Sequence, residues 1–114
     1  MAADGRAILL VDLPGYGQST KAVSEDHSAH SKAAMAKDIR ELTKHLSPDK
    51  KVLLIGHDRG ARASYRWALN YEEEVAGIVL MDIVPVWWMY DNMKLENSRH
   101  LETFGSYHWI FLAL

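Results

Sequence analysis

Residues 52–62 read Val-Leu-Leu-Ile-Gly-His-Asp-Arg-Gly-Ala-Arg. The apolar start of this stretch is typical of a buried strand, and the residues after Gly60 favour a helix. The stretch therefore predicts a strand, a tight turn and a helix, with Asp58 at the tip of the turn. Gly56 and Gly60 lack a Cβ atom, so we expect the strand and the helix to approach each other closely. Enzymes present a nucleophile on a turn of this geometry.

The identity of Asp58 restricts the reaction that such a turn can support. A carboxylate that attacks an acyl carbon forms an anhydride, whereas attack on a saturated carbon forms an ester that water can later cleave. Asp58 therefore indicates displacement at an sp³ carbon, with loss of a halide or opening of an epoxide. The alternative is that Asp58 only caps the following helix, a position at which aspartate is common. The turn alone leaves both interpretations open.

Composition limits the class of protein. The chain has 114 residues, of which 48% are hydrophobic, enough for the core of one domain. Its net charge of −2 gives no reason to expect nucleic acid or an acidic membrane as a partner. The absence of cysteine excludes disulfides and thiolate nucleophiles. With no apolar stretch of membrane-spanning length and no signal peptide, we expect a soluble, cytoplasmic protein without metal or cofactor.

The rest of the chain repeats the alternation of apolar strand, polar turn and helix. We expect two further buried strands, over Ala7–Val11 and Gly77–Met81, which end at Asp12 and Asp82. A helix from Ser28 or Ser31 to Ser47 carries an apolar stripe for the sheet, made of Met35, Ile39, Leu42 and Leu46. A second helix over Ala61–Asn70 places Trp67 and Leu69 in the core. This order predicts an α/β fold with a parallel sheet and right-handed crossovers.

The pattern changes after Pro85. Large aromatic residues become frequent from there to the end of the chain, at Trp87, Trp88, Tyr90, Phe104, Tyr107, Trp109 and Phe111. We therefore predict a first unit over residues 1–85 and a second over residues 86–114. The second unit either roofs a pocket or is an ordinary packed helical hairpin. Both ends of the chain are abrupt for a domain boundary, so we expect a fragment.

Four motifs in order resemble the α/β-hydrolase superfamily, specifically its haloacetate (fluoroacetate) dehalogenase and epoxide hydrolase branch. They are Asp-Leu-Pro-Gly-Tyr-Gly-Gln-Ser at 12–19, Gly-His-Asp-Arg-Gly-Ala-Arg at 56–62, Leu-Met-Asp-Ile-Val-Pro at 80–85 and Tyr-His-Trp at 107–109. The first is shared widely in the superfamily, whereas the second together with the last is more specific. The resemblance implies a partial α/β-hydrolase fold, a parallel sheet with flanking helices followed by the start of a helical cap.

The resemblance also implies roles for particular residues. Asp58 matches the nucleophile and Asp82 the acid of the catalytic triad. Arg59 and Arg62 match the pair that holds the substrate carboxylate, which a guanidinium can bind through two parallel hydrogen bonds. His108 and Trp109 match the cap residues of the family that donate N–H groups to the departing halide. The implied reaction is hydrolytic dehalogenation of a short 2-haloacid, a small-molecule substrate, through an ester on Asp58.

Two other functions stay open. Epoxide hydrolases of the same branch protonate the epoxide oxygen with cap tyrosines, for which Tyr90 and Tyr107 are candidates. A non-catalytic fragment that binds a small carboxylate or a partner chain is the second alternative. Members of the branch are often homodimers, and the sequence leaves the oligomeric state of this chain open.

Two of the family's motifs have no match in these residues. Members carry a His-Gly-x-Pro oxyanion loop ahead of the strand that matches Ala7–Val11, and a base histidine after a late strand. Neither His57 nor His100 occupies the position of that base. We therefore expect the ester on Asp58 to form without complete turnover. The strand that carries the oxyanion loop also lies between the strands at Ala7–Val11 and Val52–Ile55, so we expect those two not to be neighbours.

Overall fold

The computed structural model describes residues 5–21, 28–85, 87–88 and 91. The chain divides into two compact units, Met1–Ile83 and Val84–Leu114. The first unit contains all the regular elements described below. The prediction that residues 86–114 begin a helical cap falls almost entirely outside the described residues and stays a prediction. No helix among the described residues is long and apolar enough to cross a membrane.

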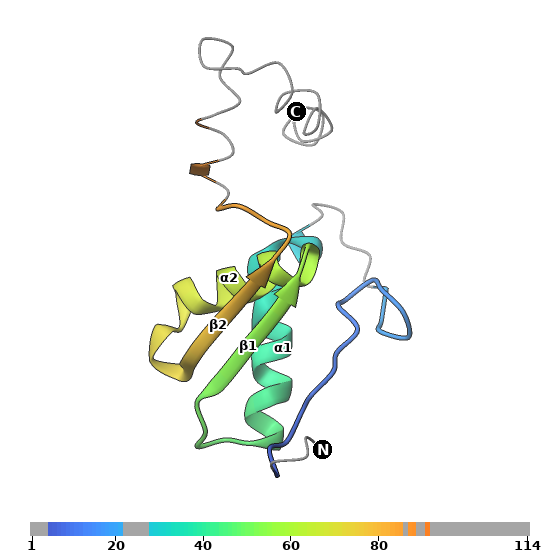
Figure 1. The fold of residues 1–114 in the computed structure, drawn as a ribbon. Helices are drawn as coiled ribbons and strands as arrows, with labels where there is room; N and C mark the ends of the chain where they lie inside the picture. The colour runs from blue at the N-terminus through green and yellow to red at the C-terminus, as the bar shows by residue number, and fades with distance from the viewer. Residues whose placement is uncertain (1–4, 22–27, 86, 89–90, 92–114) are drawn as a thin grey trace. The chain divides into compact units, whose positions relative to one another are not determined.

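The centre of the first unit is a parallel pair of strands. Strand β1, Val52–His57, lies beside β2, Val75–Met81, with Leu54 opposite Ile78 and His57 opposite Met81. Helix α2, Arg59–Asn70, and the short helix η2, Glu72–Glu74, connect the two strands (Figure 1). The predicted strand, turn, helix and parallel strand are therefore confirmed, as is the α/β class of the fold.

Helix α1, Lys32–Leu46, precedes the strands and follows the short helix η1, Ser28–His30. The side chain of Ser31 accepts a hydrogen bond of 3.1 Å from the backbone N–H of Ala34. Ser31 is thus the N-cap, which decides between the two serines that the sequence left open. The helix ends at Leu46, with Ser47 as the C-cap, as expected.

Both long helices contribute to one core on one face of the strands. Ala36, Leu54 and Trp67 form its buried centre, and four partly buried residues pack around them: Ile39, Val52, Tyr71 and Val75. Trp67 is only 3% exposed, so its prediction as a core residue is confirmed. The other face of β1 is open among the described residues, with Leu53 and Ile55 at 55% and 63% exposure.

Two predictions of burial are wrong. Leu69 is 58% exposed because it points away from the strands at the end of α2. The expected stripe on α1 holds at Met35, which is buried, but Leu42 and Leu46 are exposed. The sheet has two strands in the described part of the chain, and the buried part of the stripe is confined to the start of α1.

The predicted strand over Ala7–Val11 is also wrong. Residues 6–13 adopt no regular secondary structure, and Ile8, Leu9 and Leu10 are exposed. A strand exists only when its backbone groups pair with a neighbour. The described sheet has the order β1-β2, so this segment has no neighbour to pair with. Because no strand forms here, the expectation that it would not adjoin the strand before the turn stays a prediction.

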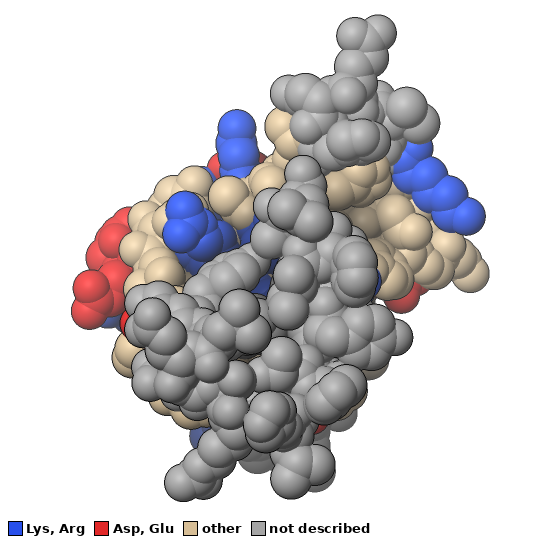
Figure 2. All heavy atoms as spheres, turned by 90° about the horizontal axis from the view of Figure 1, so that it is seen from above, with Lys and Arg blue, Asp and Glu red and all other residues tan. Residues whose placement is uncertain are grey.

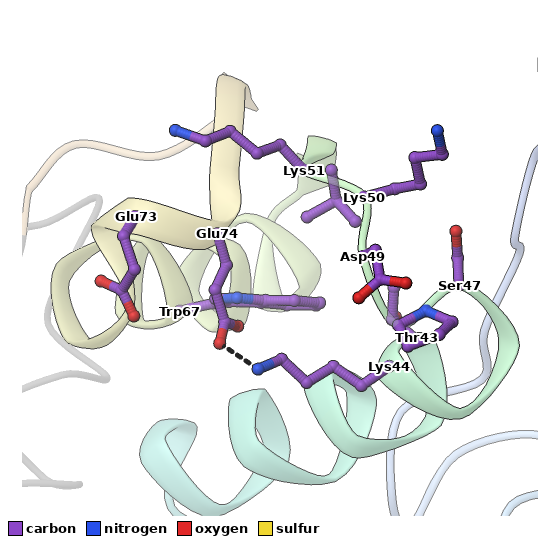
Figure 3. Close-up of a pocket in the computed structure, with 11 residues that line it drawn as sticks. Thr43, Lys44, Ser47, Asp49, Lys50, Lys51, Trp67, Glu73 and Glu74 are labelled. Carbon is purple, nitrogen blue, oxygen red and sulfur yellow. Dashed lines mark ion pairs between the residues drawn. The ribbon is translucent and has the colours of Figure 1, made fainter.

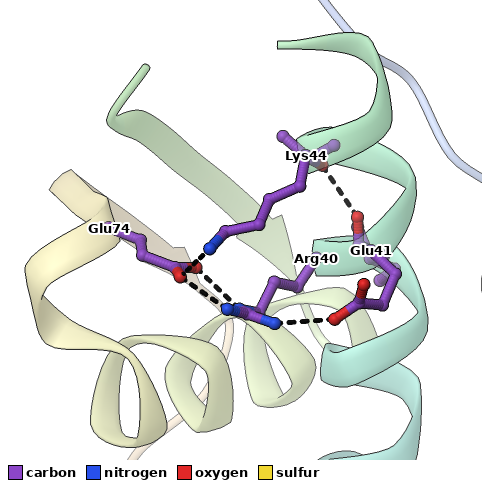
Figure 4. A network of polar contacts seen from close by, with 6 residues as sticks. Arg40, Glu41, Lys44 and Glu74 are labelled. Atoms are coloured by element: carbon purple, nitrogen blue, oxygen red, sulfur yellow. Dashed lines mark hydrogen bonds and ion pairs between the residues drawn. The ribbon is translucent and has the colours of Figure 1, made fainter. Parts of the chain in front are cut away.

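An ion-pair network joins α1 to η2 (Figure 4). The guanidinium of Arg40 donates to both carboxylate oxygens of Glu74, at 2.7 and 2.6 Å, and stacks on the ring of Tyr71 at 4.1 Å. Lys44 also pairs with Glu74. The hydrogen bond from Arg40 is the main reason that the pKa of Glu74 falls from 4.5 to about 2. Glu74 is thus held in an ion pair between η2 and α1.

Candidate active site

The turn after β1 has the geometry of a nucleophile elbow. Asp58 lies at its tip with φ 44° and ψ −111°, a backbone conformation that residues other than glycine rarely adopt. Its backbone N–H donates to the carbonyl of Met81 at 3.1 Å, and its carbonyl accepts from the N–H of Arg62 at 3.0 Å. These bonds hold the strained residue between the end of β2 and the first turn of α2.

Gly56 permits the close approach of β1 and α2. A Cβ atom at this position would lie 2.6 Å from both the Cα and the backbone N of Ala61. Because those atoms belong to the backbone, no side-chain rotation could relieve the overlap. At Gly60 a Cβ atom would meet no described atom within 4 Å, so the expected role of Gly60 in this approach is wrong.

The side chain of Asp58 does not cap α2. Asp58 occupies the N-cap position, but its carboxylate makes no hydrogen bond to the helix. The side chain is exposed. Of the two interpretations of this aspartate, the helix cap is therefore wrong. A carboxylate that is free of the backbone and projects from the turn has the arrangement that nucleophilic attack needs.

Two arginines follow Asp58 on the first turn of α2. Arg59 is exposed, and its guanidinium lies 5.9 Å from the centre of the Tyr16 ring. Arg62 is 8% exposed. The residues thus differ in their surroundings, one over an aromatic ring and one buried beside the elbow. Whether they act together on a carboxylate stays a prediction.

Asp82 follows the end of β2 and adopts φ 60°. Its carboxylate Oδ2 lies 3.5 Å from Nε2 of His57, the last residue of β1. The parallel register places these residues side by side, because His57 pairs with Met81 directly before Asp82. The sequence had not connected them. Their proximity could have been inferred from the sequence, because both residues lie at the ends of parallel strands, and parallel strands end at the same edge of a sheet.

The loop over residues 12–19 is built around Asp12. The carboxylate of Asp12 accepts from the backbone N–H of Gln18 at 3.0 Å, and its carbonyl accepts from the hydroxyl of Ser19 at 2.6 Å. These bonds give Asp12 an architectural role in the loop. Tyr16 lies in the same loop, beneath the guanidinium of Arg59.

One cation close to the elbow was missed in the sequence. Lys32 opens α1, and it is half-buried. Burial lowers the pKa of Lys32, the charges of Arg59 and Arg62 lower it further, and the carboxylate of Asp58 raises it. The three charges that act on the pKa of Lys32 all belong to the elbow and the first turn of α2. Spacing in the sequence carries no sign of this, because 26 positions separate Lys32 from Asp58.

Figure 2 views the end of the molecule toward which both strands run in Figure 1, and Lys and Arg side chains are visible there among the described residues. The proposed halide donors, His108 and Trp109, lie outside the described residues. In the described part of the chain, no group of three or more His, Cys, Asp or Glu side chains could hold a metal ion.

A cavity of about 270 Å³ lies at the opposite end of the strands (Figure 3). It is lined by the end of α1, the loop before β1, Trp67 and η2. None of its lining residues belongs to the elbow. Lys44 and Glu74 form an ion pair at its edge. This cavity is therefore separate from the candidate active site.

Residues 1–97 match the sequence model of the alpha/beta hydrolase fold. This match covers most of the chain, and the elbow described above lies within it. The chain belongs to the alpha/beta hydrolase fold family.

Relatives within this family differ in reaction. The chain is 35% identical over 113 residues to a fluoroacetate dehalogenase from Burkholderia sp, an alignment that covers 98% of this chain and 35% of that protein. It is 34% identical over 83 residues to a soluble epoxide hydrolase from Corynebacterium sp. (strain C12), which covers 73% of this chain and 27% of that protein. The chain thus spans about a third of the length of the curated relatives it matches.

A solved structure agrees in fold. ALR0039 from Nostoc sp PCC 7120, described as an alpha/beta hydrolase, is similar to this chain with a TM-score of 0.73 and 37% sequence identity. The similarity covers 89% of this chain and 33% of that one. The predicted superfamily, with its dehalogenase and epoxide hydrolase relatives, is therefore confirmed, and the short length relative to these proteins agrees with the expected fragment.

Proposed function

We propose that this chain carries the nucleophile and the carboxylate-binding residues of a haloacetate dehalogenase-like hydrolase. The observation that carries the proposal is the strained backbone of Asp58, whose exposed carboxylate makes no hydrogen bond to the helix it precedes. Strain of this kind is found where a turn must present a reactive side chain. The substrate class is a short 2-haloacid, because Arg59 and Arg62 follow the nucleophile directly on α2.

The first half of the reaction is a displacement at carbon. A carboxylate oxygen of Asp58 donates an electron pair to the α-carbon of the haloacid. The new carbon–oxygen bond forms as the carbon–halogen bond breaks, and the halide leaves with the bonding pair. Arg59 and Arg62 hold the substrate carboxylate so that the α-carbon lies in line with Asp58. His108 and Trp109 donate N–H groups to the halide, where charge accumulates.

The second half is hydrolysis of the ester. Water adds to the carbonyl carbon of the Asp58 ester and gives a proton to a base. The bond between this carbon and the alkyl oxygen then breaks, and the alkyl oxygen takes the proton back from the base, which releases a 2-hydroxy acid and restores the carboxylate. Asp82 is the acid that orients the base, and these 114 residues offer no histidine at the position that the family uses for it. We therefore propose that the chain alone forms the ester without turning it over.

Mass spectrometry after incubation with fluoroacetate tests the first half. Fluoroacetate is the right probe because its carbon–fluorine bond does not alkylate side chains spontaneously. We expect one carboxymethyl group on the peptide that contains Asp58, and hydroxylamine should remove it because it is an ester. Asp58→Asn is the matched control and should acquire no adduct. A folded chain, verified by circular dichroism, that shows no adduct at Asp58 would contradict the proposal.

An epoxide hydrolase is the second candidate, favoured by the similarity to the soluble epoxide hydrolase. The same nucleophile would then open an epoxide ring and form a hydroxyalkyl ester on Asp58. A neutral epoxide gives the two arginines no charge to bind, which is why we prefer the haloacid. Parallel incubations with styrene oxide and fluoroacetate separate the two, since only the true substrate class should leave an ester on Asp58.

A further inference from the structure

Tyr16 is held in a tight turn. Its backbone N–H donates to the carbonyl of Leu13 at 2.8 Å, and its carbonyl accepts from the N–H of Ser19 at 3.0 Å. Gly15 and Gly17, on either side of it, adopt φ 87° and 49°, conformations that favour glycine. The backbone therefore fixes the place from which the ring of Tyr16 starts, while Tyr16 itself stays 41% exposed.

The guanidinium of Arg59 lies over this ring. Its Cζ is 5.9 Å from the ring centre, within the range of a cation–π interaction. Among the described residues, Arg59 forms no hydrogen bond or ion pair, so none of the carboxylates of Asp12, Asp58 and Asp82 occupies its donors. The ring thus contacts the cation while its N–H groups stay open to a ligand.

Arg40 shows the contrasting arrangement (Figure 4). Its guanidinium also lies over a tyrosine ring, that of Tyr71, at 4.1 Å, but it donates to both carboxylate oxygens of Glu74 and to Glu41. An aromatic face attracts a guanidinium through the quadrupole of the ring and takes none of its N–H donors. A guanidinium that only a ring holds is therefore positioned and can still bind a carboxylate through two parallel hydrogen bonds.

We propose that Tyr16 is a positioning residue of the elbow site, whose ring holds the guanidinium of Arg59 in the orientation that binds the carboxylate of the substrate. The inference rests on the proposed function, in which Arg59 binds that carboxylate. An exposed arginine samples many rotamers, and the ring raises the fraction of Arg59 that is in the binding one. Tyr16 acts through Arg59 and not on the reacting carbon.

Binding of acetate tests the inference without requiring catalysis. Acetate has the substrate's carboxylate and no leaving group, so its dissociation constant can be measured by titration of a ¹⁵N-labelled chain at constant ionic strength, followed at the Nε–H signal of Arg59. Tyr16→Leu should weaken acetate binding by about twofold to fivefold, the factor that one exposed cation–π contact supplies. Tyr16→Phe keeps the ring face and should retain binding. The heteronuclear NOE of Arg59 Nε should fall in Tyr16→Leu and not in Tyr16→Phe, because only the first frees the guanidinium.

Tyr71→Leu is the matched control. It removes the ring beneath Arg40, which belongs to the network between α1 and η2 and not to the elbow. This variant should leave both the acetate affinity and the heteronuclear NOE of Arg59 unchanged.

The outcomes separate this inference from the proposed function. If Tyr16→Leu folds and binds acetate as tightly as the unaltered chain, or if Tyr16→Phe or Tyr71→Leu weakens binding as much, the inference is wrong. Failure of the unaltered chain to bind acetate would also overturn it. A purely architectural role for Tyr16 would lower the unfolding midpoint of Tyr16→Leu and leave the acetate affinity and the NOE of Arg59 unchanged. The proposed function fails on a different measurement, the absence of the ester on Asp58.

Discussion

Replacement of Gly56 by alanine tests the contact on which the elbow depends. The added Cβ atom would lie 2.6 Å from the Cα and N atoms of Ala61 and 2.7 Å from the carbonyl carbon of Gly60, whereas ordinary contacts begin at about 3.4 Å. Strand β1 and helix α2 must therefore separate by about 0.8 Å. Overpacking against backbone of this kind costs about 1–3 kcal/mol. We expect Gly56→Ala to lower the free energy of unfolding by that amount.

Gly60→Ala is a matched control with the opposite expected sign. A Cβ atom there meets no described atom within 4 Å, and Gly60 lies in the first turn of α2. Alanine in place of a helical glycine stabilises by about 0.5–1 kcal/mol. Urea unfolding, followed by the fluorescence of the buried Trp67, measures both variants. With a slope of about 1 kcal/mol per M, Gly56→Ala should lower the midpoint by about 1 M or more. Equal destabilisation by both substitutions would refute the reasoning.

Three further predictions follow from contacts described above. Trp67→Ala should destabilise the chain by about 3–5 kcal/mol, and Leu69→Ala by less than about 0.5 kcal/mol, in urea unfolding, because only Trp67 is buried. Ser31→Ala should reduce helicity and cost about 1 kcal/mol, and Ser31→Asp should restore both, as circular dichroism can measure. The pKa of Glu74 is lower in the folded chain than its ordinary 4.5, so its pairing stabilises above pH 4.5 and this stabilisation is lost as pH falls toward about 2. Thermal unfolding across this range should show that the melting temperature of Glu74→Gln falls less with acid than that of the unaltered chain. An equal fall in both would contradict the prediction.

Local sequence was sufficient to predict the strands and helices whose decisive contacts are local. Within residues 52–70 the structure agrees on the strand, the turn and the end of α2 at Asn70, whereas α2 begins at Arg59, two residues before the predicted Ala61. Helix α1 was equally predictable, because Ser31 caps it through a bond to a residue three positions away. In these cases the decisive contacts lie within one turn or one strand, where residue type alone carries the information.

Contacts between distant residues account for the predictions that were wrong. Ile8, Leu9 and Leu10 read as a buried strand, but burial requires a neighbouring strand that the local pattern cannot supply. Leu69 is apolar and lies two positions after the buried Trp67, which puts it on the opposite, exposed face of α2. Glu74 sits in an acidic run, yet Arg40, 34 positions earlier, holds it in an ion pair.

The candidate site divides in the same way. The motif identified Asp58 and the strain at the turn agrees with it, whereas the proximity of Asp82 to His57 follows from the register of two strands. The roles of Asp58, Asp82, Arg59 and Arg62 stay predictions, and the search for an ester on Asp58 tests the first of them.

The backbone of Asp58 also bears on how variants of this chain should be chosen. A residue other than glycine held at positive φ costs about 1–3 kcal/mol. Glycine at this position would relieve that strain, so Asp58→Gly is expected to be more stable than the unaltered chain while it removes the proposed nucleophile. A screen that ranks variants by melting temperature alone would therefore favour the loss of the reactive group. For this turn, resistance to unfolding and chemical competence are opposing demands on a single side chain.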